Sequence, residues 1–199
     1  MSTRLRKIGR EVISFGLTAL VLLAARSSLA DHYTVPTGSM EYTLMPGDRI
    51  VVDKLNYGFR FPFTDWELTD GTPVKRGEVV VFDSPEEDVR LVKRIVAVGG
   101  DTIVIHNGHV FITGKSMVSP ENPVEEIYDN RVVRLNLIYG GGPELAPLRV
   151  PAGYLLAIGD ARGNSRDGRL FGLIRESKVY GRAISVYYRR GEGLVWKGL

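Results

Sequence analysis

The sequence predicts a mainly β protein, in which one β-rich domain follows an apolar N-terminal helix. From Asp31 onward, short runs of β-branched residues recur between Gly, Pro and Asp, a pattern typical of strands and turns. The pair Asn107-Gly108 lies between two alternating runs and predicts a hairpin, because both turn positions need a positive φ. No long amphipathic helical pattern follows the N-terminal segment. A single β-rich domain accounts for all three observations.

The composition is that of an ordinary globular protein. Of the 199 residues, 44% are hydrophobic and 25% are charged, which excludes a disordered or collagen-like chain. The chain has no Cys, so thiol nucleophiles, Cys-based zinc sites and iron–sulfur clusters are excluded. The missing Cys does not distinguish between compartments.

Residues 1–10 form a short basic segment, which we expect to be cytoplasmic. They contain four cationic side chains and no acidic one, whereas the whole chain has a net charge of +3, so the remaining residues sum to −1. Because the basic charge lies in this segment and not on the folded body, we expect no nucleic-acid partner.

Residues 11–30 are predicted to cross a membrane. The 14 uncharged positions 12–25 precede Arg26, and a helix of that length rises about 21 Å, short of the hydrocarbon core of about 30 Å. Continuing to Ala30 gives a sufficient length if the Arg26 side chain snorkels to the interface. The pattern leaves two alternatives, an uncleaved anchor and a cleavable secretory signal. In both, residues 31–199 lie across the membrane from the basic end.

The strand-like runs within 31–199 follow one another with turn residues between them. Residues 114–150 are less regular and rich in Pro and Gly, and we interpret 103–150 as a hairpin with a small inserted lobe. The predicted strands are residues 49–54, 78–82, 89–98, 102–106, 109–113, 154–160 and 179–188.

The three His residues, His32, His106 and His109, suggest neither a catalytic triad nor a metal site. His106 and His109 are on either side of the predicted turn, so we interpret them as a cross-strand pair at the surface. Two His without a third ligand make a poor metal site. We therefore expect no metal and no cofactor.

Without a Cys or a suitable His, a Ser or Thr activated by Lys is the remaining route to a nucleophile. Lys93 and Arg94 are adjacent in an apolar run, so one of the two cations must point toward apolar neighbours. Arg cannot lose its proton in a protein, whereas burial lowers the pKa of Lys. The alternative is an exposed lysine that protects an edge strand, and this spacing alone favours that alternative.

A candidate serine lies in residues 35–40, Val-Pro-Thr-Gly-Ser-Met. Gly38 lets the backbone approach a substrate closely, and Ser39 follows it. The Thr37 hydroxyl and the Ser39 N–H together would form an oxyanion hole. The alternative is an ordinary polar turn, and this segment alone favours it.

Taken together, these segments resemble bacterial type I signal peptidase, the membrane-bound Ser/Lys endoprotease that cleaves export signals. The resemblance extends over essentially the whole chain, with each block in the family's order. The matching blocks are the basic start and apolar anchor, residues 36–40 with Thr43-Leu44 and Gly47-Asp48, residues 76–82 with Pro85, residues 92–94 leading to 99–102, the Asn-Gly hairpin, and residues 159–169.

The resemblance implies a role for each matched residue. Ser39 would be the nucleophile, Lys93 the general base, and Thr37 with Ser39 the oxyanion hole. Ser165 would hydrogen-bond Lys93 and orient it. Structural support is implied for Asp160 and Arg162 and for an ion pair between Asp167 and Arg169. The candidates for shallow pockets that accept Ala-x-Ala are Val35, Met40, Leu44 and Val92.

The resemblance also implies the fold and the surroundings. It implies a β-rich catalytic domain of the signal-peptidase and LexA-like class at 31–199, with a small inserted β lobe and one retained N-terminal transmembrane helix. The enzyme would be a single-pass protein of the cytoplasmic (inner) membrane with its catalytic domain on the periplasmic or extracytoplasmic side. Its expected partners are signal-peptide-bearing preproteins, the lipid bilayer and the export machinery.

Three residues depart from the family pattern. Tyr42 occupies the usual Pro position, and Ala161 and Gly163 replace an Asn and an Asp. These departures concern the pocket shape and the loop, not the Ser/Lys dyad, and one hypothesis is a variant with narrower substrates. Two other functions stay open: a self-cleaving Ser/Lys protease of the LexA-like kind, and a non-catalytic exported β-domain that binds partners.

Overall fold

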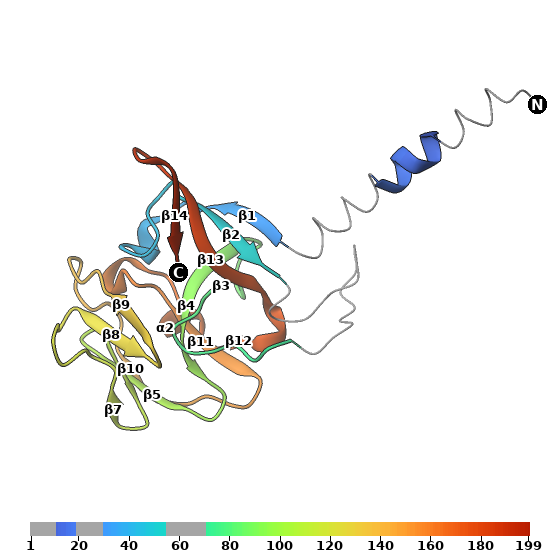
Figure 1. Cartoon of the computed structure of the whole chain (residues 1–199). Helices are drawn as coiled ribbons and strands as arrows, with labels where there is room; N and C mark the ends of the chain where they lie inside the picture. The colour runs from blue at the N-terminus through green and yellow to red at the C-terminus, as the bar shows by residue number, and fades with distance from the viewer. Residues whose placement is uncertain (1–10, 19–29, 55–70) are drawn as a thin grey trace, which may run out of the picture.

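The computed structural model describes residues 11–18, 30–54 and 71–199 (Figure 1). Residues 11–18 form a helix, whereas the predicted basic segment 1–10 and most of the predicted anchor, residues 19–29, lie outside the described residues. Within the described ranges, no helix has the length and apolar character needed to cross a membrane. The first strand begins at Ala30, the residue at which the predicted anchor ends.

The larger sheet has eight strands, and each neighbouring pair is antiparallel. Its order is β1-β2-β13-β3-β4-β11-β12, with β14 paired to β13. The bounds are β1 (Ala30–Thr34), β2 (Arg49–Asp53), β3 (Val79–Asp83), β4 (Arg90–Val98), β11 (Tyr154–Ile158), β12 (Ile174–Arg175), β13 (Val179–Arg189) and β14 (Gly193–Gly198).

Residues 102–149 form two smaller sheets beside the larger one (Figure 1). The four-stranded sheet has the order β10-β5-β6-β7, and β8 pairs with β9. The bounds are β5 (Thr102–His106), β6 (His109–Ile112), β7 (Lys115–Ser116), β8 (Glu125–Tyr128), β9 (Arg131–Arg134) and β10 (Leu145–Arg149).

The predicted Asn-Gly hairpin is confirmed. Asn107 and Gly108 have φ angles of 50° and 80°, the left-handed values that this turn requires. His106 pairs directly with His109 across the turn, as expected for a cross-strand pair. The hairpin thus places both His residues at one end of the four-stranded sheet.

Helical segments in the described part after β1 are short. They are η1 (Gly38–Met40), η3 (Arg162–Asn164), α2 (Gly168–Phe171) and η4 (Glu176–Lys178). The Asp167 carboxylate accepts a hydrogen bond from Arg169 N and caps α2, which satisfies a backbone donor that the helix leaves unpaired.

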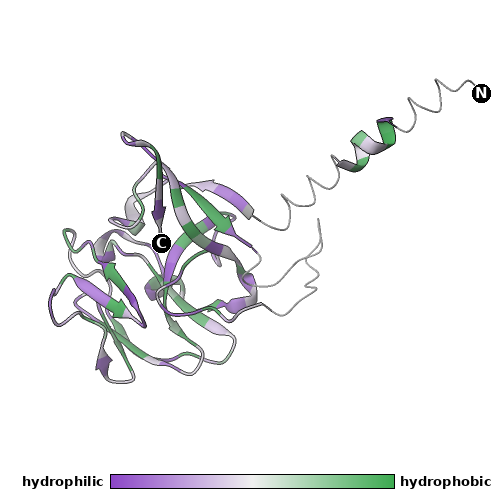
Figure 2. Ribbon diagram, viewed as in Figure 1, coloured by the Kyte–Doolittle hydropathy of each residue, from purple (hydrophilic) through white to green (hydrophobic). Residues whose placement is uncertain are grey.

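A hydrophobic core is shared between the larger sheet and the inserted segment. Val96 of β4 and Leu156 of β11 pack in one cluster with Ile105 of β5 and Val110 of β6. Burial of each such side chain contributes about 1.5–3 kcal/mol. Figure 2 shows hydrophobic stretches on strands of the larger sheet and of the inserted segment. The inserted segment is therefore packed against β4 and β11 and not tethered loosely to them.

All seven predicted strands are present, with ends that differ by one or two residues. The sequence did not reveal the strands within residues 114–150. These strands have two to five residues, and β10 contains Pro147, so none of them produces a clear alternating pattern.

Candidate active site

The fold brings Ser39 and Lys93 together although they are 54 positions apart in the chain. Lys93 Nζ lies 2.6 Å from Ser39 Oγ. Ser39 is in η1 and Lys93 is in β4, and their exposed fractions are only 9% and 3%. A hydroxyl and an amine are thus in hydrogen-bond contact in a nearly water-free place.

Strand β4 makes room for this contact because it extends beyond the end of its neighbour. β11 ends at Ile158, which pairs with Arg94, so the preceding residues of β4 have a partner only in β3. The turn containing Ser39 lies beside this part of β4, and the Ser39 carbonyl oxygen accepts a hydrogen bond from Ala161 N at 3.1 Å. Because Lys93 is buried here, the alternative of an exposed edge-strand lysine is wrong.

Both adjacent cations are buried, but only Arg94 has carboxylate partners in contact. Arg94 Nε and Nη2 donate to the two carboxylate oxygens of Asp160 at 2.8 Å and 2.7 Å, and Nη1 donates to the Gly77 carbonyl at 2.6 Å. Among the described residues, no carboxylate forms an ion pair with Lys93. The arginine therefore retains its charge by pairing, while the amine of the buried lysine has only the Ser39 hydroxyl as a hydrogen-bond partner in the described part of the chain.

Burial lowers the pKa of Lys93 to about 8 from its ordinary value of 10.5. The nearby carboxylates of Asp167 and Asp160 raise this pKa, and the Arg169 guanidinium lowers it. Desolvation is the largest of these effects because a charged amine is unfavourable away from water. Near pH 8 about half of the Lys93 amine is therefore neutral and able to accept a proton.

The Thr37 side chain lies on the exposed side of Ser39. Its Oγ1 is 3.4 Å from Ser39 Oγ, and the residue has extended backbone angles just before η1. The Thr37 hydroxyl is thus adjacent to the Ser39 hydroxyl, and its part in an oxyanion hole stays a prediction.

Asp160, Arg162, Asp167 and Arg169 form a buried hydrogen-bonded support beneath Ser39. The Asp167 carboxylate accepts hydrogen bonds from Arg169 Nε at 2.9 Å and Nη2 at 2.8 Å, and from Gly159 N at 3.0 Å. Burial raises the pKa of Asp167, but the hydrogen bond and charge of Arg169 outweigh it, so this pKa is lowered. Arg169 Nη2 also donates to the Arg162 carbonyl at 2.6 Å, which ties the two ends of the segment together.

Ser165 Oγ and the Ser39 carbonyl both lie next to Gly159, and in this structure Ser165 Oγ forms no hydrogen bond with Lys93. This hydroxyl oxygen is buried. A Cβ added at Gly159 would overlap both Ser165 Oγ and the Ser39 carbonyl oxygen, so only glycine fits between them. The orientation of Lys93 by Ser165 stays a prediction.

The pocket candidates lie in the apolar wall next to Ser39. Val35, Met40 and Leu44 are 3%, 1% and 0% exposed and belong to one core cluster, against which the partly buried Val92 packs. As the structure stands, this wall is closed, and its use as a substrate pocket stays a prediction.

The sequence did not single out Glu126, although it is fully buried at the centre of a polar cluster. Its carboxylate accepts hydrogen bonds from Arg162 Nη2 at 2.6 Å, Tyr128 Oη at 2.5 Å and Val110 N at 2.8 Å. The available signal was a glutamate that shares a strand face with Tyr128.

Thr43 and Asn136 were also missed. Thr43 Oγ1 donates to Asp160 Oδ2 at 2.5 Å and accepts from Arg94 Nη2 at 2.9 Å. Asn136 N donates to the Asp160 carbonyl at 2.9 Å, and the Asn136 carbonyl accepts from Arg162 N at 3.1 Å. Both residues hold the loop that contacts Ser39. Thr43 binds this loop from the segment that carries Ser39, and Asn136 binds it from the inserted segment.

The three departures from the family pattern fit the local packing. Ala161 is fully buried, and its backbone N–H binds Ser39 as described above. A Cβ at Gly163 would overlap the Tyr139 carbonyl, so this position must be glycine here. Tyr42 is 39% exposed, and its ring lies 5.1 Å from the Arg134 guanidinium.

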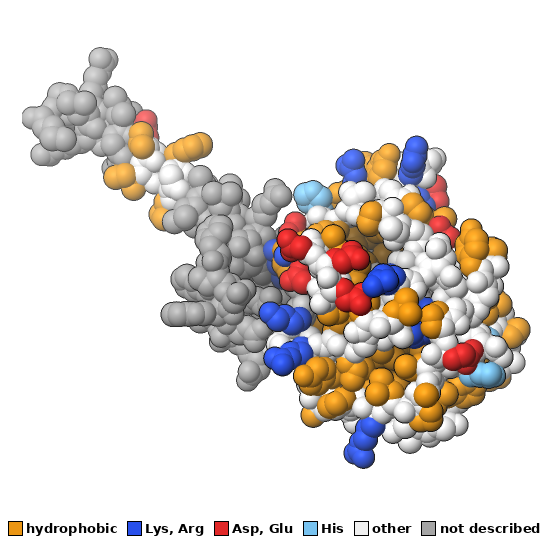
Figure 3. Space-filling view, turned by 180° about the vertical axis from the view of Figure 1, so that it is seen from behind, with side chains coloured by type: hydrophobic (Ala, Val, Ile, Leu, Met, Phe, Trp, Pro, Cys, Tyr) orange, Lys and Arg blue, Asp and Glu red, His pale blue; other side chains and the backbone are white. Residues whose placement is uncertain are grey.

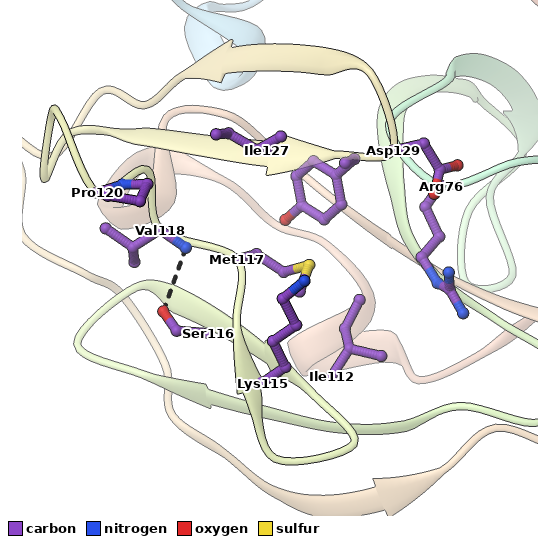
Figure 4. A pocket seen from close by; sticks show the side chains of 10 residues that line it. Arg76, Ile112, Lys115, Ser116, Met117, Val118, Pro120, Ile127 and Asp129 are labelled. Carbon is purple, nitrogen blue, oxygen red and sulfur yellow. Dashed lines mark hydrogen bonds between the residues drawn. The ribbon is translucent and has the colours of Figure 1, made fainter.

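A cavity of about 490 Å³ lies away from Ser39 and Lys93, between β7 and β8 (Figure 4). Figure 4 shows Arg76 and Asp129 at one side of it and the Ser116 hydroxyl, which accepts a hydrogen bond from Val118 N, at another. None of the predicted site residues lines it.

On the face seen in Figure 3, acidic side chains gather in one area, whereas Lys and Arg side chains are scattered.

Comparisons with known proteins assign the family. The model of the family described as "Signal peptidase, peptidase S26" matches residues 8–188. The chain therefore belongs to this signal peptidase family, and it is a peptidase. This membership agrees with the resemblance found in the sequence and not with the LexA-like alternative.

Individual relatives are similar over most of the chain. Signal peptidase I of Pseudomonas fluorescens is 30% identical over 200 aligned positions, gaps included, and the match covers 87% of this chain and 70% of that protein. Probable signal peptidase I-1 of Synechocystis sp. is 30% identical over 188 residues, covering 90% and 82%. A crystal structure of a signal peptidase I from Enterococcus faecalis has 24% identity and a TM-score of 0.38, covering 55% of this chain and 95% of that one.

Proposed function

We propose that this peptidase cleaves signal peptides from exported preproteins after small residues of an Ala-x-Ala motif, with Ser39 as the nucleophile and Lys93 as the general base. The observation that supports this most directly is the 2.6 Å contact between Lys93 Nζ and Ser39 Oγ, both buried. The pKa of Lys93, lowered to about 8, makes the neutral amine available near pH 8.

In the proposed reaction the neutral Lys93 amine takes the Ser39 proton while Oγ attacks the scissile carbonyl carbon. The Ser39 N–H and the Thr37 hydroxyl stabilise the resulting oxyanion. The Lys93 ammonium then gives its proton to the leaving amine, and an ester joins Ser39 to the signal peptide. Water attacks this ester with Lys93 again accepting a proton, which releases the signal peptide and restores Ser39.

The proposal includes a membrane location. Residues 11–30 would be a retained anchor with residues 1–10 in the cytoplasm, and the domain 31–199 would lie on the periplasmic or extracytoplasmic side of the inner membrane. Ser39 comes only nine positions after Ala30, a stretch that spans at most about 30 Å when extended, so the site would stay close to the bilayer. The preprotein, the bilayer and the export machinery would be the partners.

The experiment compares the full chain in detergent micelles with its Ser39→Ala and Lys93→Met variants on a signal-bearing precursor. We expect cleavage by the wild type only. Lys115→Met removes an exposed lysine in β7 and is the matched control, which should cleave like the wild type. Processing by either dyad variant would contradict the mechanism, and failure of the folded wild type to cut any Ala-x-Ala substrate would favour the non-catalytic alternative.

A further inference from the structure

The side chain of Glu41, the residue that follows η1, folds back over the turn that carries Ser39. A Cβ added at Gly38 would lie 2.5 Å from Glu41 Oε1, so this carboxylate covers the Gly38 face of the turn. Side chains three residues apart lie over one another in a 3₁₀ turn, which accounts for this contact. The Glu41 N–H also donates to the Gly38 carbonyl oxygen at 3.1 Å. Glu41 thus contacts the turn through both its backbone and its side chain.

A single side chain of the inserted segment holds the Glu41 carboxylate. Asn136 lies 95 positions further along the chain and is only 2% exposed, and its Nδ2 donates to Glu41 Oε2 at 3.2 Å. Asn136 Oδ1 accepts a hydrogen bond from Ile138 N at 3.1 Å, which keeps the amide turned with its Nδ2 toward the carboxylate. Within residues 30–54 and 71–199 Glu41 forms no salt bridge, so no cation competes with this amide. The contact is therefore a specific one between a buried donor and one carboxylate.

Asn136 also binds the loop that contacts Ser39 from the other side. Its backbone N–H and carbonyl bind the two residues that flank Ala161, and Ala161 N donates to the Ser39 carbonyl. The contacts therefore form a closed ring that runs from the turn through Glu41 and Asn136 to the loop, and back to Ser39. In this ring the contact between Glu41 and Asn136 is the link that is made by side chains alone.

We infer that Glu41 is a positioning residue for the cleavage reaction, and that it acts through Asn136 by holding the turn that presents the Ser39 hydroxyl and N–H. This inference rests on the proposed function. The Glu41 carboxylate binds an amide of the protein and takes no part in the proton transfer. A displacement of about 1 Å in a reacting group can lower a rate by about 10². Loss of the contact should therefore lower kcat and leave KM almost unchanged, because the proposed substrate pocket is the apolar wall and not this contact.

The first experiment measures kcat and KM of the full chain in detergent micelles on a precursor peptide with an Ala-x-Ala motif. Glu41→Ala should lower kcat by about tenfold or more, with KM within about twofold of the wild type. Glu41→Gln retains an oxygen that accepts from Asn136, so it should keep at least about half of kcat. Glu121→Ala removes an exposed glutamate that bonds through its backbone N–H, and this matched control should behave like the wild type.

Exchanging the two partners tests the contact itself. Asn136→Asp alone sets two carboxylates against each other and should lower kcat by about tenfold or more. Glu41→Gln/Asn136→Asp restores one donor and one acceptor in reverse order, so it should recover most of the lost activity.

Amide hydrogen exchange measures the same contact without catalysis. In Glu41→Ala the Ala161 N–H should exchange about tenfold faster or more, because the ring that holds its bond to Ser39 is open. The Val150 N–H, which donates to the Asp101 carbonyl in another part of the fold, should keep its wild-type rate.

The outcomes separate this inference from the proposed function. Wild-type kcat in Glu41→Ala overturns the inference and leaves the Ser/Lys mechanism intact, and so does a Glu41→Gln/Asn136→Asp variant that stays as impaired as Asn136→Asp. Faster exchange throughout Glu41→Ala would show a general structural role and would also overturn it. If Glu41→Ala fails to fold, the exchanged pair gives the same comparison. A folded wild type that cuts no precursor would instead contradict the proposed function.

Discussion

Replacing Lys93 with Met should stabilise the protein at neutral pH. The folded state holds the pKa of this amine at about 8, whereas an unfolded lysine has a pKa of 10.5. One pKa unit corresponds to about 1.4 kcal/mol, so keeping a charged Lys93 in the folded protein costs about 3 kcal/mol. Met has a similar length and no charge, so it avoids this cost. Loss of the hydrogen bond to Ser39 Oγ destabilises the variant by about 1 kcal/mol. We expect a net gain of about 2 kcal/mol.

The gain should depend on pH in a defined direction. Below pH 8 the amine is charged in both states, and the folded state bears the whole cost. Between pH 8 and 10.5 it is neutral when folded and charged when unfolded, so unfolding takes up a proton and wild-type stability rises with pH. Above pH 10.5 the amine is neutral in both states, and the cost disappears.

Urea unfolding of the full chain in detergent, at pH 6.5, 8, 9.5 and 10.5, measures this effect. The free-energy difference between Lys93→Met and wild type should be constant up to about pH 8 and then fall. Lys115→Met, which removes an exposed lysine, should show no such pH-dependent difference. A Lys93→Met protein that is less stable than wild type at pH 7, or a difference independent of pH, would refute the reasoning.

Three further predictions follow from the same geometry. The kcat/KM of the wild type should rise about tenfold per pH unit below pH 8 and level off above it, because the reactive form has a neutral Lys93; a pH profile of peptide cleavage checks this. Thr37→Val should lower kcat by about 10²–10³ with little change in melting temperature, since it removes one oxyanion donor from an exposed residue; Thr37→Ser should retain most of the activity. Gly159→Ala should destabilise the protein by about 1–3 kcal/mol and impair cleavage, because its Cβ would displace the Ser39 carbonyl; calorimetry and the precursor assay measure both.

The sequence was sufficient to predict the strands with a clear alternating pattern, whereas the pairing of Ser39 with Lys93 was predicted only through the family resemblance. The spacing indicated that one of the two adjacent cations must point toward apolar neighbours, but by itself it favoured an exposed edge-strand lysine. In the structure both are buried, and the difference between them is the carboxylate pair that Asp160 provides to Arg94. That pairing joins residues 66 positions apart, and nothing local in the run around Arg94 specifies it.

The support for the loop could be predicted only in part. The ion pair between Asp167 and Arg169 is short-range and formed as expected. The partner of Arg162 could not be predicted, because Glu126 lies in a four-residue strand of the segment that appeared irregular. A buried glutamate becomes recognisable only when the fold shows which cation removes its desolvation cost.

This contact explains why the inserted segment matters to a site whose reacting groups all lie elsewhere. Arg162 is completely buried, donates through Nε to the Gly159 carbonyl, and is held by Glu126 at its other end. Gly159 is also the residue that leaves space for the Ser39 carbonyl. The ion pair therefore holds the loop in the position in which Ala161 N donates its hydrogen bond to the Ser39 carbonyl. Replacing both partners with apolar residues of similar volume often preserves stability. A Glu126→Leu/Arg162→Met variant that keeps its melting temperature but loses kcat would separate this positioning role from simple stabilisation of the fold, whereas full activity would show that the pair is dispensable for the site.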